Sequence, residues 1–448
     1  MEKYLMLREK YPEFCYEGYE VYNCGGEIGL KFHFSQSDEI KFSPEWVLPF
    51  DYGQYASGEN KSFIDYLVFN LGMVELVSYW KACCSPVVRV KCGSLDSWQI
   101  GWWKKLYFYG LGEFFYRNGI KTDINGFMDI VCESKEVLPR LSVMPKTSGN
   151  LIAVGGGKDS VVTLEKLSDS FEDNHCFIIN AHGASVRTAN AAGYGENGIV
   201  GLTRRLDKRI IELNNAGYLN GHTPFSAIVA FSSYLTAFLM KKRYIVLSNE
   251  SSANESYVKG TQVNHQYSKS VEFENDFREY TSKYLAFGCE YFSLLRCWNE
   301  WRIVKEFAGH EKYFDVFCSC NLGSKSNDWH WCCNCSKCLY IYIMLTPFLA
   351  KGRVEKIFGK NLLDSEDMLC YLDGLVCDNF DKPFECIGTR QEINAALCTA
   401  VEQYDDKTKL PLLLKEYYKK YYKPQDISAV DNFFDPCNNI PQDFLMER

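Results

Sequence analysis

Positive charge is in short supply in this sequence. The 49 lysines and arginines are outnumbered by 57 aspartates and glutamates, and the net charge is -8 at pH 7. A chain of this balance has no electrostatic footprint for a nucleic acid or an anionic membrane surface. We therefore expect neither a nucleic acid nor a membrane among its partners.

Long apolar runs and targeting segments are lacking as well. No stretch reaches the length that spans a bilayer. Residues 1–10 lack the apolar core and the small-residue cleavage site of a signal peptide. The sequence therefore predicts a cytoplasmic protein. Its 46% hydrophobic and 24% charged residues are an ordinary globular balance.

The chain also has no internal repeat and no low-complexity tract. With 448 residues it is too long for one ordinary core, so we expect two or three domains. Residues 1–145 are rich in aromatic residues, and residues 29–34 alternate between apolar and polar side chains as a half-buried strand does. Helical stretches at 63–82 and 98–118 complete a predicted N-terminal α+β domain.

The pattern changes after a linker at 143–150 that contains proline and glycine. Beyond it, apolar strand-like runs alternate with helical stretches, which predicts parallel βαβ units with helices on both faces of a sheet. The predicted strands are 151–154, 176–179 and 244–247, and the predicted helices are 160–167 and 225–240. The second helix has Thr223 as its expected N-cap and Pro224 at its first position. We assign 146–345 to this α/β domain and 346–448 to a mainly helical C-terminal region.

A run of three glycines follows the first of these strands. Residues 155–160 read Gly-Gly-Gly-Lys-Asp-Ser and lead into a helix. Glycines here let the backbone turn sharply and bring its N–H groups close to a phosphate, and the helix N-terminus adds partial positive charge. The run is not a Walker A loop, because Asp159 follows Lys158 where serine or threonine is required, and its glycines are too close together for the dinucleotide fingerprint. A purely structural glycine turn is the alternative.

Six of the twenty cysteines fall within one segment, 318–338. Thiolates at such short spacing suit a closed, tetrahedral, structural zinc site. The predicted zinc ligands are Cys320, Cys332, Cys335 and Cys338. Cys318 and Cys333 are neighbours that could replace one of them. A disulfide framework is the alternative, which a cytoplasmic location argues against.

Gly156, Gly157, Asp159 and Ser160 after a strand resemble the PP-loop of the ATP pyrophosphatases, which bind ATP and release pyrophosphate. The usual family loop begins with serine, where this chain has Gly155, so one hydroxyl donor is missing while the backbone cradle remains. The resemblance implies an α/β fold with a parallel-sheet, PP-loop (HUP-like) core. A PP-loop followed by four cysteines also looks like 7-cyano-7-deazaguanine synthase, which activates a carboxylate with ATP.

Further segments narrow the resemblance. They are residues 78–82, 110–116, 249–254, 263–270, 331–332 and 382–389. Together with the glycine loop they resemble the UDP-N-acetylmuramoyl-L-alanyl-L-glutamate epimerases of peptidoglycan synthesis over most of the chain. That family inverts the terminal L-glutamate of UDP-MurNAc-L-Ala-L-Glu, with ATP and Mg²⁺ as cofactors and AMP and pyrophosphate as products. The resemblance implies an ATP-dependent epimerase that works through an acyl-adenylate.

The same resemblance suggests which residues form the site. The expected phosphate-binding residues are Gly155, Gly156, Gly157, Asp159 and Ser160, with Asp159 near Mg²⁺. Lys158 is either a phosphate contact or a solvated lysine, and His182 is either an adenosine contact or a structural histidine. Asn249, Glu250 and Asn254 are candidates for metal or substrate, or else form a polar turn that caps the sheet.

Other candidates concern the substrate. His265 and Lys269 are expected to contact its carboxylate or diphosphate. Arg187, Arg204 and Arg205 are either contacts for the diphosphate of UDP or simply exposed. The epimerising base is left open among Cys297, Cys386 and His265.

Two other functions remain open at this point. A deazaguanine synthase-like amidating enzyme would adenylate a carboxylate in the same way but would need ammonia. A nucleotide-binding module with structural zinc would bind ATP without turnover, and Gly155 favours that reading. The partners expected for an epimerase are the UDP-MurNAc-dipeptide and an upstream ligase that adds L-glutamate.

Overall fold

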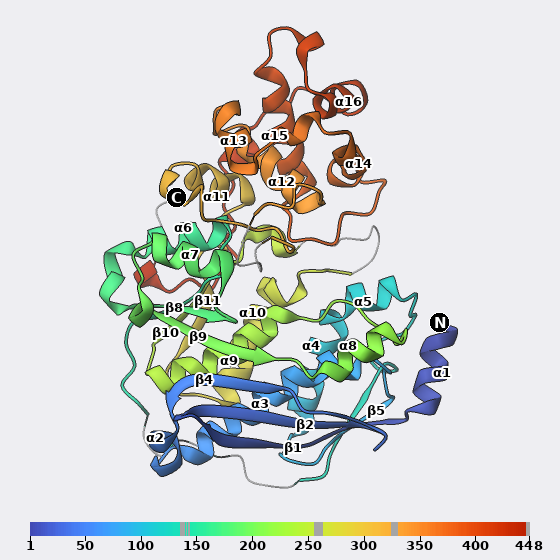
Figure 1. Cartoon of the computed structure of the whole chain (residues 1–448), viewed down its shortest axis with the longest axis vertical. Coiled ribbons are helices and arrows are strands. Elements are labelled where there is room, and N and C mark those ends of the chain that lie inside the picture. The colour runs from blue at the N-terminus through green and yellow to red at the C-terminus, as the bar shows by residue number, and fades with distance from the viewer. Residues whose placement is uncertain (135–138, 140, 142–143, 255–262, 324–329, 445–448) are drawn as a thin grey trace. The chain divides into compact units, whose positions relative to one another are not determined.

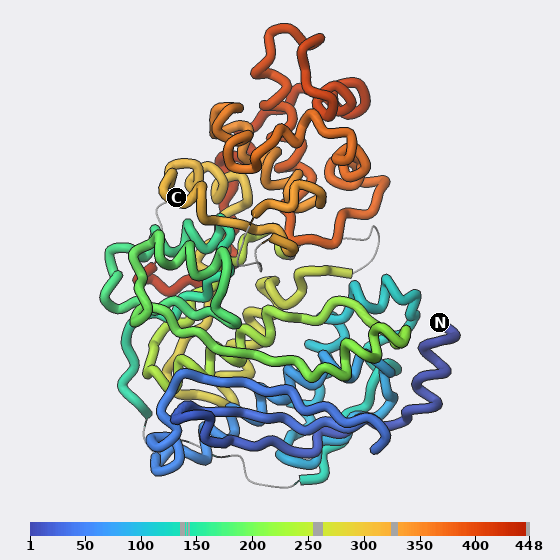
Figure 2. Tube along the Cα trace, viewed as in Figure 1, coloured from blue at the N-terminus to red at the C-terminus, as the bar shows by residue number. Residues whose placement is uncertain are grey.

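The computed structural model describes residues 1–134, 139, 141, 144–254, 263–323 and 330–444, which form two compact units (Figures 1 and 2). The first unit comprises Met1–Leu151, Val200–Ile245 and Gln266–Tyr291. The second comprises Ile152–Ile199, Val246–His265 and Phe292–Arg448. Each unit is assembled from segments that are far apart in the sequence. The three domains expected from the sequence are contiguous, whereas these two units are not. The bounds of those three domains stay a prediction.

The first unit contains a sheet of long and short strands. They are β1 (Glu13–Cys24), β2 (Glu27–Gln36), β3 (Ile40–Phe42), β4 (Glu45–Asp51), β5 (Val87–Val90), β6 (Asp129–Cys132) and β9 (Ile199–Arg205). Their order is β9-β4-β2-β1-β5-β6, with β3 beside β2. β2 pairs antiparallel with β1, β3 and β4, and β4 pairs antiparallel with β9, while β5 is parallel to β1 and β6. The strand predicted at 29–34 is confirmed within β2.

Helices cover this sheet and supply most of the aromatic core. They are α1 (Glu2–Lys10), α2 (Tyr52–Ser57), α3 (Lys61–Trp80), α4 (Ser97–Gly110), α5 (Gly112–Arg117), α8 (Lys208–Asn215), α9 (Phe225–Met240) and α10 (Val271–Tyr284). α3 packs against β1 and β2, and a Cβ on Gly72 would overlap the Tyr16 ring, so this glycine lets the helix approach the sheet closely. Trp103 is fully buried and stacks on Phe231 of α9 at 5.0 Å between ring centroids. The aromatic residues of this region are therefore core.

Two helix predictions need correction. The stretch 98–118 is two helices, because the chain leaves helical geometry at Leu111 between α4 and α5. The bounds of α9 agree with the predicted 225–240, but Pro224 occupies the N-cap position in place of Thr223. Proline has no side-chain oxygen, so no side chain caps the start of α9.

The second unit has an α/β part followed by a helical part. Its strands are β8 (Asn174–Ile179) and the carboxyl ends of β7 (Asn150–Ala153), β10 (Tyr244–Leu247) and β11 (Glu290–Ser293), which begin in the first unit. Their order is β11-β10-β7-β8. Its helices are α6 (Lys158–Lys166), α7 (Gly183–Ala191), α11 (Glu300–Phe307), α12 (Ser336–Leu345), α13 (Lys351–Phe358), α14 (Leu369–Val376), α15 (Arg390–Glu402), α16 (Leu412–Lys420) and α17 (Ser428–Asp431).

The strands and helices predicted for this part are confirmed to within two residues, and the fold is mixed α/β. β7 and β8 are neighbours joined through α6, the kind of connection that parallel strands need. Val154 N–H donates to Phe177 O at 3.0 Å. The helical region predicted beyond residue 346 is also confirmed. The assignment of the core to the PP-loop type stays a prediction.

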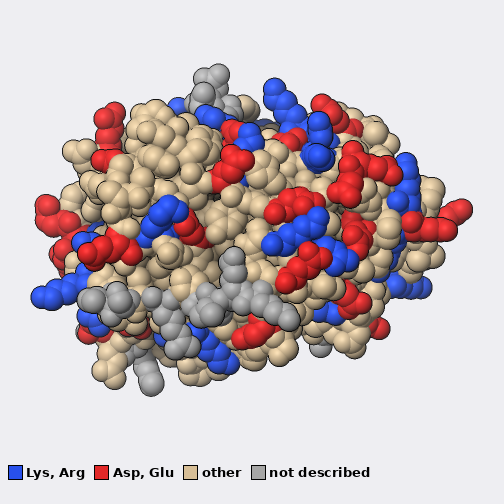
Figure 3. Space-filling model, turned by 90° about the horizontal axis from the view of Figure 1, so that it is seen from below, with Lys and Arg blue, Asp and Glu red and all other residues tan. Residues whose placement is uncertain are grey.

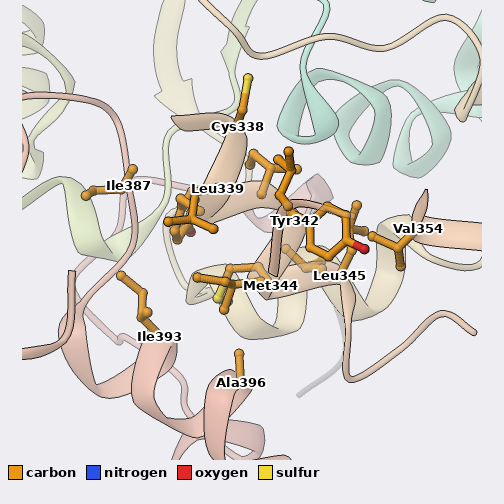
Figure 4. Packing of buried hydrophobic residues seen from close by; sticks show 14 of the residues in the cluster. Cys338, Leu339, Tyr342, Met344, Leu345, Val354, Ile387, Ile393 and Ala396 are labelled. Atoms are coloured by element: carbon orange, nitrogen blue, oxygen red, sulfur yellow. The ribbon is translucent and has the colours of Figure 1, made fainter. Parts of the chain in front are cut away.

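Helix α12 is the centre of the helical part. All of its residues are buried. Figure 4 shows its side chains between Val354 of α13 on one side and Ile393 and Ala396 of α15 on the other. Cys338 belongs to this helix, so the cysteine segment is anchored in the core of the second unit.

The surface carries charges of both signs. On the face shown in Figure 3, basic and acidic side chains are intermingled, as the composition predicts. Of the helices in the described part of the chain, none has the length and apolar character needed to cross a membrane.

Candidate functional site

The glycine loop, residues Gly155, Gly156 and Gly157, runs from the end of β7 to the start of α6. Gly155 N–H donates to Ser160 Oγ at 3.0 Å, which ties the first residue of the loop to the helix. Gly156 has a φ of +87°, and a Cβ at this position would lie 2.6 Å from the backbone of α7 at Ala184 and Ser185. Both the conformation and the space at Gly156 therefore require glycine.

A second segment holds the opposite side of the loop. Cys318 N–H donates to Gly156 O at 2.9 Å, and Thr188 Oγ1 donates to the same oxygen at 3.4 Å. A Cβ on Gly157 would lie 2.7 Å from Ser319 Oγ. Gly157 is the N-cap of α6 and has no side chain with which to accept the first N–H groups of the helix. These N–H groups form the kind of cradle that binds anions.

Lys158 points away from solvent into a group of carboxylates. Its ammonium lies 2.5 Å from Asp159 Oδ1 and also forms an ion pair with Glu300. Asp159, Glu250 and Glu300, here called the carboxylate cluster, offer oxygens that all lie within 4.8 Å of one another. Lys158 is fully buried, so it is not a solvated lysine.

Burial and charge act in opposite directions on this cluster. Burial disfavours the ammonium of Lys158, but the carboxylates of Asp159 and Glu300 outweigh it and raise the pKa of this lysine. Burial raises the pKa of Glu300 to about 7, although the Lys158 ammonium opposes that shift. Asp159 is the partly exposed member, with 29% of its side chain accessible.

The turn after β10 contributes Glu250 and is held by the last residue of β11 and by the segment that follows it. Arg296 is fully buried and its Nη1 donates to the backbone oxygen of Glu250 at 2.7 Å. Asn249 Nδ2 donates to Ser293 Oγ at 3.0 Å. Asn249 and Glu250 therefore follow the carboxyl end of a strand, as predicted. The side chain of Asn254 lies outside the described residues.

The segment 382–389 reaches the same cluster through Glu300. A Cβ on Gly388 would lie 3.0 Å from side-chain carbons of Glu300 and 2.8 Å from Tyr340 Oη. Trp301 N–H, at the start of α11, donates to Glu392 Oε1 at 3.2 Å. Glu392 in turn forms the capping box of α15 with Thr389. The start of α11 is thus held by the start of α15.

The remaining predicted residues are more scattered. His182 is the half-buried N-cap of α7, and its Nδ1 contacts Asn180 O. His265 contacts the ring of Phe384, at 6.3 Å between ring centroids. Lys269 belongs to the first unit, in a 3-10 turn (Tyr267–Lys269), whereas His182 and His265 belong to the second.

Among the arginines, Arg187 and Arg205 are exposed. Arg204, in the first unit, donates twice to the buried carboxylate of Glu75, at 2.9 and 2.7 Å. Burial of Arg204 is therefore explained by an internal ion pair.

Sequence reasoning missed Glu300 and Arg296. Both come from the stretch after β11, where no glycine run or repeated spacing marks them. The one local signal was that of a helix start. Asn299 is a favoured N-cap residue that precedes Glu300, and its side chain accepts a hydrogen bond from Arg302 N–H.

The four predicted zinc ligands lie together and form the cysteine cluster, Cys320, Cys332, Cys335 and Cys338. Their sulfur atoms all lie within 4.8 Å of one another. Cys338 Sγ is 3.6 Å from Cys332 Sγ and 3.5 Å from Cys335 Sγ. A tetrahedron of thiolates at ~2.3 Å from zinc has sulfurs about 3.8 Å apart, so the group fits zinc.

The alternatives to this ligand set are resolved by the geometry. A disulfide bond needs sulfurs about 2 Å apart, and none of the twenty cysteines forms one, so the disulfide framework is wrong. Cys333 Sγ lies 3.2 Å from Phe358 O, and neither Cys333 nor Cys318 belongs to the cluster.

Within the cysteine cluster, ionisation of one thiol is favoured at the expense of its neighbours. Hydrogen bonds from Cys335 and Cys338 to the Cys320 sulfur lower the pKa of Cys320. The same contact with Cys320 raises the pKa of Cys338, and it raises the pKa of Cys335 to about 12. Four thiolates side by side therefore need a cation among them.

Comparison with known proteins matches most of the chain to one family. The model of the MurL N-terminal domain matches residues 6–294, and that of the MurL C-terminal domain matches residues 316–427. A curated protein of Xanthomonas oryzae pv. oryzae, named UDP-N-acetyl-alpha-D-muramoyl-L-alanyl-L-glutamate epimerase, is 32% identical over 357 residues, which cover 78% of this chain and 78% of that protein. Proteins of the same name from Micromonospora sp. and Salinispora tropica are each 35% identical, covering 74% of this chain and 74% and 72% of their own. No solved structure gives a significant match.

Proposed function

The chain belongs to the MurL family, and from that premise we propose that it is an ATP-dependent epimerase of UDP-MurNAc-L-Ala-L-Glu. It converts the terminal L-glutamate of this substrate to D-glutamate, through an acyl-adenylate, and releases AMP and pyrophosphate. The observation that carries the proposal is the glycine loop, whose uncapped helix N-terminus is built to bind an anion.

Activation by ATP answers a chemical problem. The α-proton of glutamate next to an ionised carboxylate is very weakly acidic, because its removal would place a second negative charge beside the first. Joining the carboxylate to AMP removes that charge and makes the enolate accessible. A base then takes the proton from one face, reprotonation on the other face inverts the centre, and hydrolysis of the anhydride releases the product and AMP.

The roles of the loop residues follow from their positions. Gly156 and Gly157 present backbone N–H groups to the phosphates, while Gly155 donates its N–H to Ser160 Oγ and leaves room for the nucleotide because it has no side chain. His182, at the start of α7, is assigned to the adenosine side of the nucleotide. Lys158 acts through the carboxylate cluster by holding Asp159, since its ammonium is committed to that group.

Magnesium fits the partly exposed edge of the carboxylate cluster. Asp159 is the member that solvent reaches, so it would hold the ion, with Asn249 and Glu250 supporting the turn beside it. The ion would neutralise charge on the phosphates of ATP. The cysteine cluster would hold a structural zinc ion through its four thiolates, which stabilises the fold of the segment around Cys320.

The candidates for the epimerising base can be narrowed. Burial raises the pKa of Cys297 to about 11, which leaves little thiolate at neutral pH. Cys386 is half-buried and close in sequence to Phe384, whose ring contacts His265. We therefore assign the base to His265 or Cys386. Lys269, which lies in the first unit, is kept as a candidate contact for the substrate diphosphate.

The proposed chemistry also implies partners and a location. The substrate carries L-glutamate, so a ligase that adds L-glutamate to UDP-MurNAc-L-Ala must act before this enzyme. ATP and UDP-linked precursors are substrates of cytoplasmic enzymes, in keeping with the location expected from the sequence.

The proposal is tested in heavy water with UDP-MurNAc-L-Ala-L-Glu, ATP and Mg²⁺. The terminal glutamate should gain deuterium at its α-carbon as it inverts, with formation of AMP and pyrophosphate. An ATP analogue that cannot release pyrophosphate should stop exchange and inversion together. Asp159→Asn should do the same, while Asp169→Asn, an exposed aspartate of the same unit, should leave both unchanged. Exchange that proceeds equally well without ATP would refute the mechanism.

The same assay separates the alternatives. An amidating enzyme would consume ATP, require ammonia and give a nitrogen-containing product with no exchange at the α-carbon. A binding module would give neither exchange nor AMP. Formation of ADP and inorganic phosphate would show that a different bond of ATP is cleaved.

A further inference from the structure

The glycine loop offers few side-chain donors to a phosphate. Position 155 has no side chain, and the Ser160 hydroxyl accepts the N–H of Gly155 while keeping its own proton for one further bond. The ammonium of Lys158 is paired with Asp159 and Glu300. Within residues 155–160 only Ser160 keeps a side-chain proton to donate, so any second hydroxyl donor must come from another segment.

Ser319 is in the right place to supply one. Its Oγ would be 2.7 Å from a Cβ on Gly157, and its own Cβ would be 3.6 Å from that atom, so the hydroxyl lies directly over the N-cap of α6. The neighbouring N–H of Cys318 donates to Gly156 O at 2.9 Å, which fixes this segment against the loop. The following residue, Cys320, belongs to the cysteine cluster. Ser319 is therefore held in position from both sides.

The Ser319 hydroxyl is also available for a ligand. Ser319 is half-buried, and its Oγ takes part in no hydrogen bond with any residue in the described part of the chain. Ser185, on the opposite wall of the loop, is different, because its Oγ donates to His182 O at 2.9 Å. Of these two serines beside the loop, only Ser319 has its proton uncommitted.

We propose that the Ser319 hydroxyl binds the phosphates of the nucleotide and replaces the loop hydroxyl that is lost at Gly155. The inference rests on the proposed binding of ATP at this loop. A hydroxyl that donates to a charged phosphate oxygen makes a stronger hydrogen bond than one between neutral groups. The segment that carries the cysteine cluster thus takes part in nucleotide binding directly.

The test is the Ser319→Ala variant, with the dissociation constants of MgATP and of adenosine measured by calorimetry. Loss of one charge-assisted hydrogen bond should weaken MgATP binding about tenfold. Adenosine has no phosphate, so its affinity should change less than about twofold. Ser185→Ala is the matched control, and it should weaken MgATP binding less than about threefold because its hydroxyl already has an acceptor.

A compensating change sharpens the test. A Cβ on Gly155 would have only Ser160 Oγ within 4 Å, at 3.9 Å, so a serine fits there. Gly155→Ser in the Ser319→Ala background should recover most of the lost MgATP affinity. Zinc content and melting temperature, measured on every variant, should stay at the wild-type values, which excludes a change in the fold of the cysteine segment.

Each outcome bears on one claim. If the wild-type protein does not bind MgATP, the proposed function itself fails. If the wild type binds MgATP and Ser319→Ala binds it equally well, only the assignment of Ser319 is overturned. Equal losses of MgATP and adenosine affinity would also overturn it, since the serine would then act on the shape of the site and not on the phosphates.

Discussion

The cysteine cluster and the carboxylate cluster are alike in the spacing of their acidic groups but differ in the cation that balances them. Each gathers acidic groups of the second unit whose ligand atoms all lie within 4.8 Å of one another. The carboxylate cluster contains its own cation, the ammonium of Lys158. In the cysteine cluster, the described residues show hydrogen bonds between thiols where the carboxylate cluster has an ammonium.

The source of the balancing cation decides how each cluster is stabilised. A buried anion is tolerated when a cation lies beside it, and that cation is either built into the chain or taken from solution. The carboxylate cluster is complete once the chain has folded. Under the zinc proposal, the cysteine cluster is complete only when the ion joins it, so its contribution to stability depends on metal.

The largest expected effect comes from breaking the cysteine cluster. Cys338→Ser removes a thiolate from a group anchored in the buried helix α12. We expect loss of zinc and a fall of more than about 4 kcal/mol in the free energy of unfolding. Zinc is measured by elemental analysis and stability by denaturant unfolding. Cys370→Ser, at an exposed cysteine outside the cluster, is the control. Wild-type protein purified without zinc would contradict the assignment.

Removing the ammonium of Lys158 should make the carboxylate cluster depend on an external cation, as is proposed for the cysteine cluster. Lys158→Met leaves the three carboxylates without their buried partner, at a cost of about 3–5 kcal/mol near pH 8. The variant should also gain more thermal stability from added Mg²⁺ than the wild type does, because an external ion then replaces the ammonium. Lys166→Met, at the other end of the same helix and partly exposed, should change little. An unchanged melting temperature for Lys158→Met would show that the ion pairs contribute nothing.

A pH series separates the charge of Glu300 from its packing. Its folded pKa of about 7 is above the ordinary value of 4.5, so folding favours the protonated form. The stability that this preference provides is fully present below pH 4.5 and is lost as the pH rises through 7. In Glu300→Gln the free energy of unfolding should fall less over that interval, by up to about 3 kcal/mol. Parallel pH profiles for the two proteins would mean that Glu300 is ionised throughout.

The smallest effect tests the boundary of the cysteine cluster. Cys333 lies beside a ligand in the sequence, but its sulfur contacts Phe358 O. Cys333→Ser keeps a donor for that oxygen, so we expect a change within about 1 kcal/mol and full zinc content. Loss of zinc from this variant, measured against Cys338→Ser, would place Cys333 among the ligands.

The same contrast explains what the sequence could predict. Three of the four cysteines recur at a fixed short spacing, and the glycine loop is contiguous, so both were visible as motifs. β7, β8, β10 and α9 were also predicted closely, since each is a continuous apolar run with clear ends. These features depend on neighbours in the chain.

The parts that were missed depend on distant neighbours. Glu300 and Arg296 are functional candidates only because the fold brings them to Lys158 and Glu250. The solvated reading of Lys158 failed for the same reason, since a lysine at the start of a helix looks exposed until its partners are known. The interruption at Leu111 did have a local signal, because Gly110 and Gly112 flank it and glycine is a poor helix former.

The loop's dependence on distant segments also has a consequence for synthesis. Every segment of the first unit has been synthesised once Tyr291 has been made, so that unit can close before the second is complete. The glycine loop is made before then but waits for Cys318 to bind Gly156, and Glu300 waits longer still for the turn at Gly388. At roughly 5–20 residues per second, the nascent loop stays unsupported for roughly tens of seconds. The proposed nucleotide site is therefore completed late in synthesis, and its loop is open to chaperones and proteases until then.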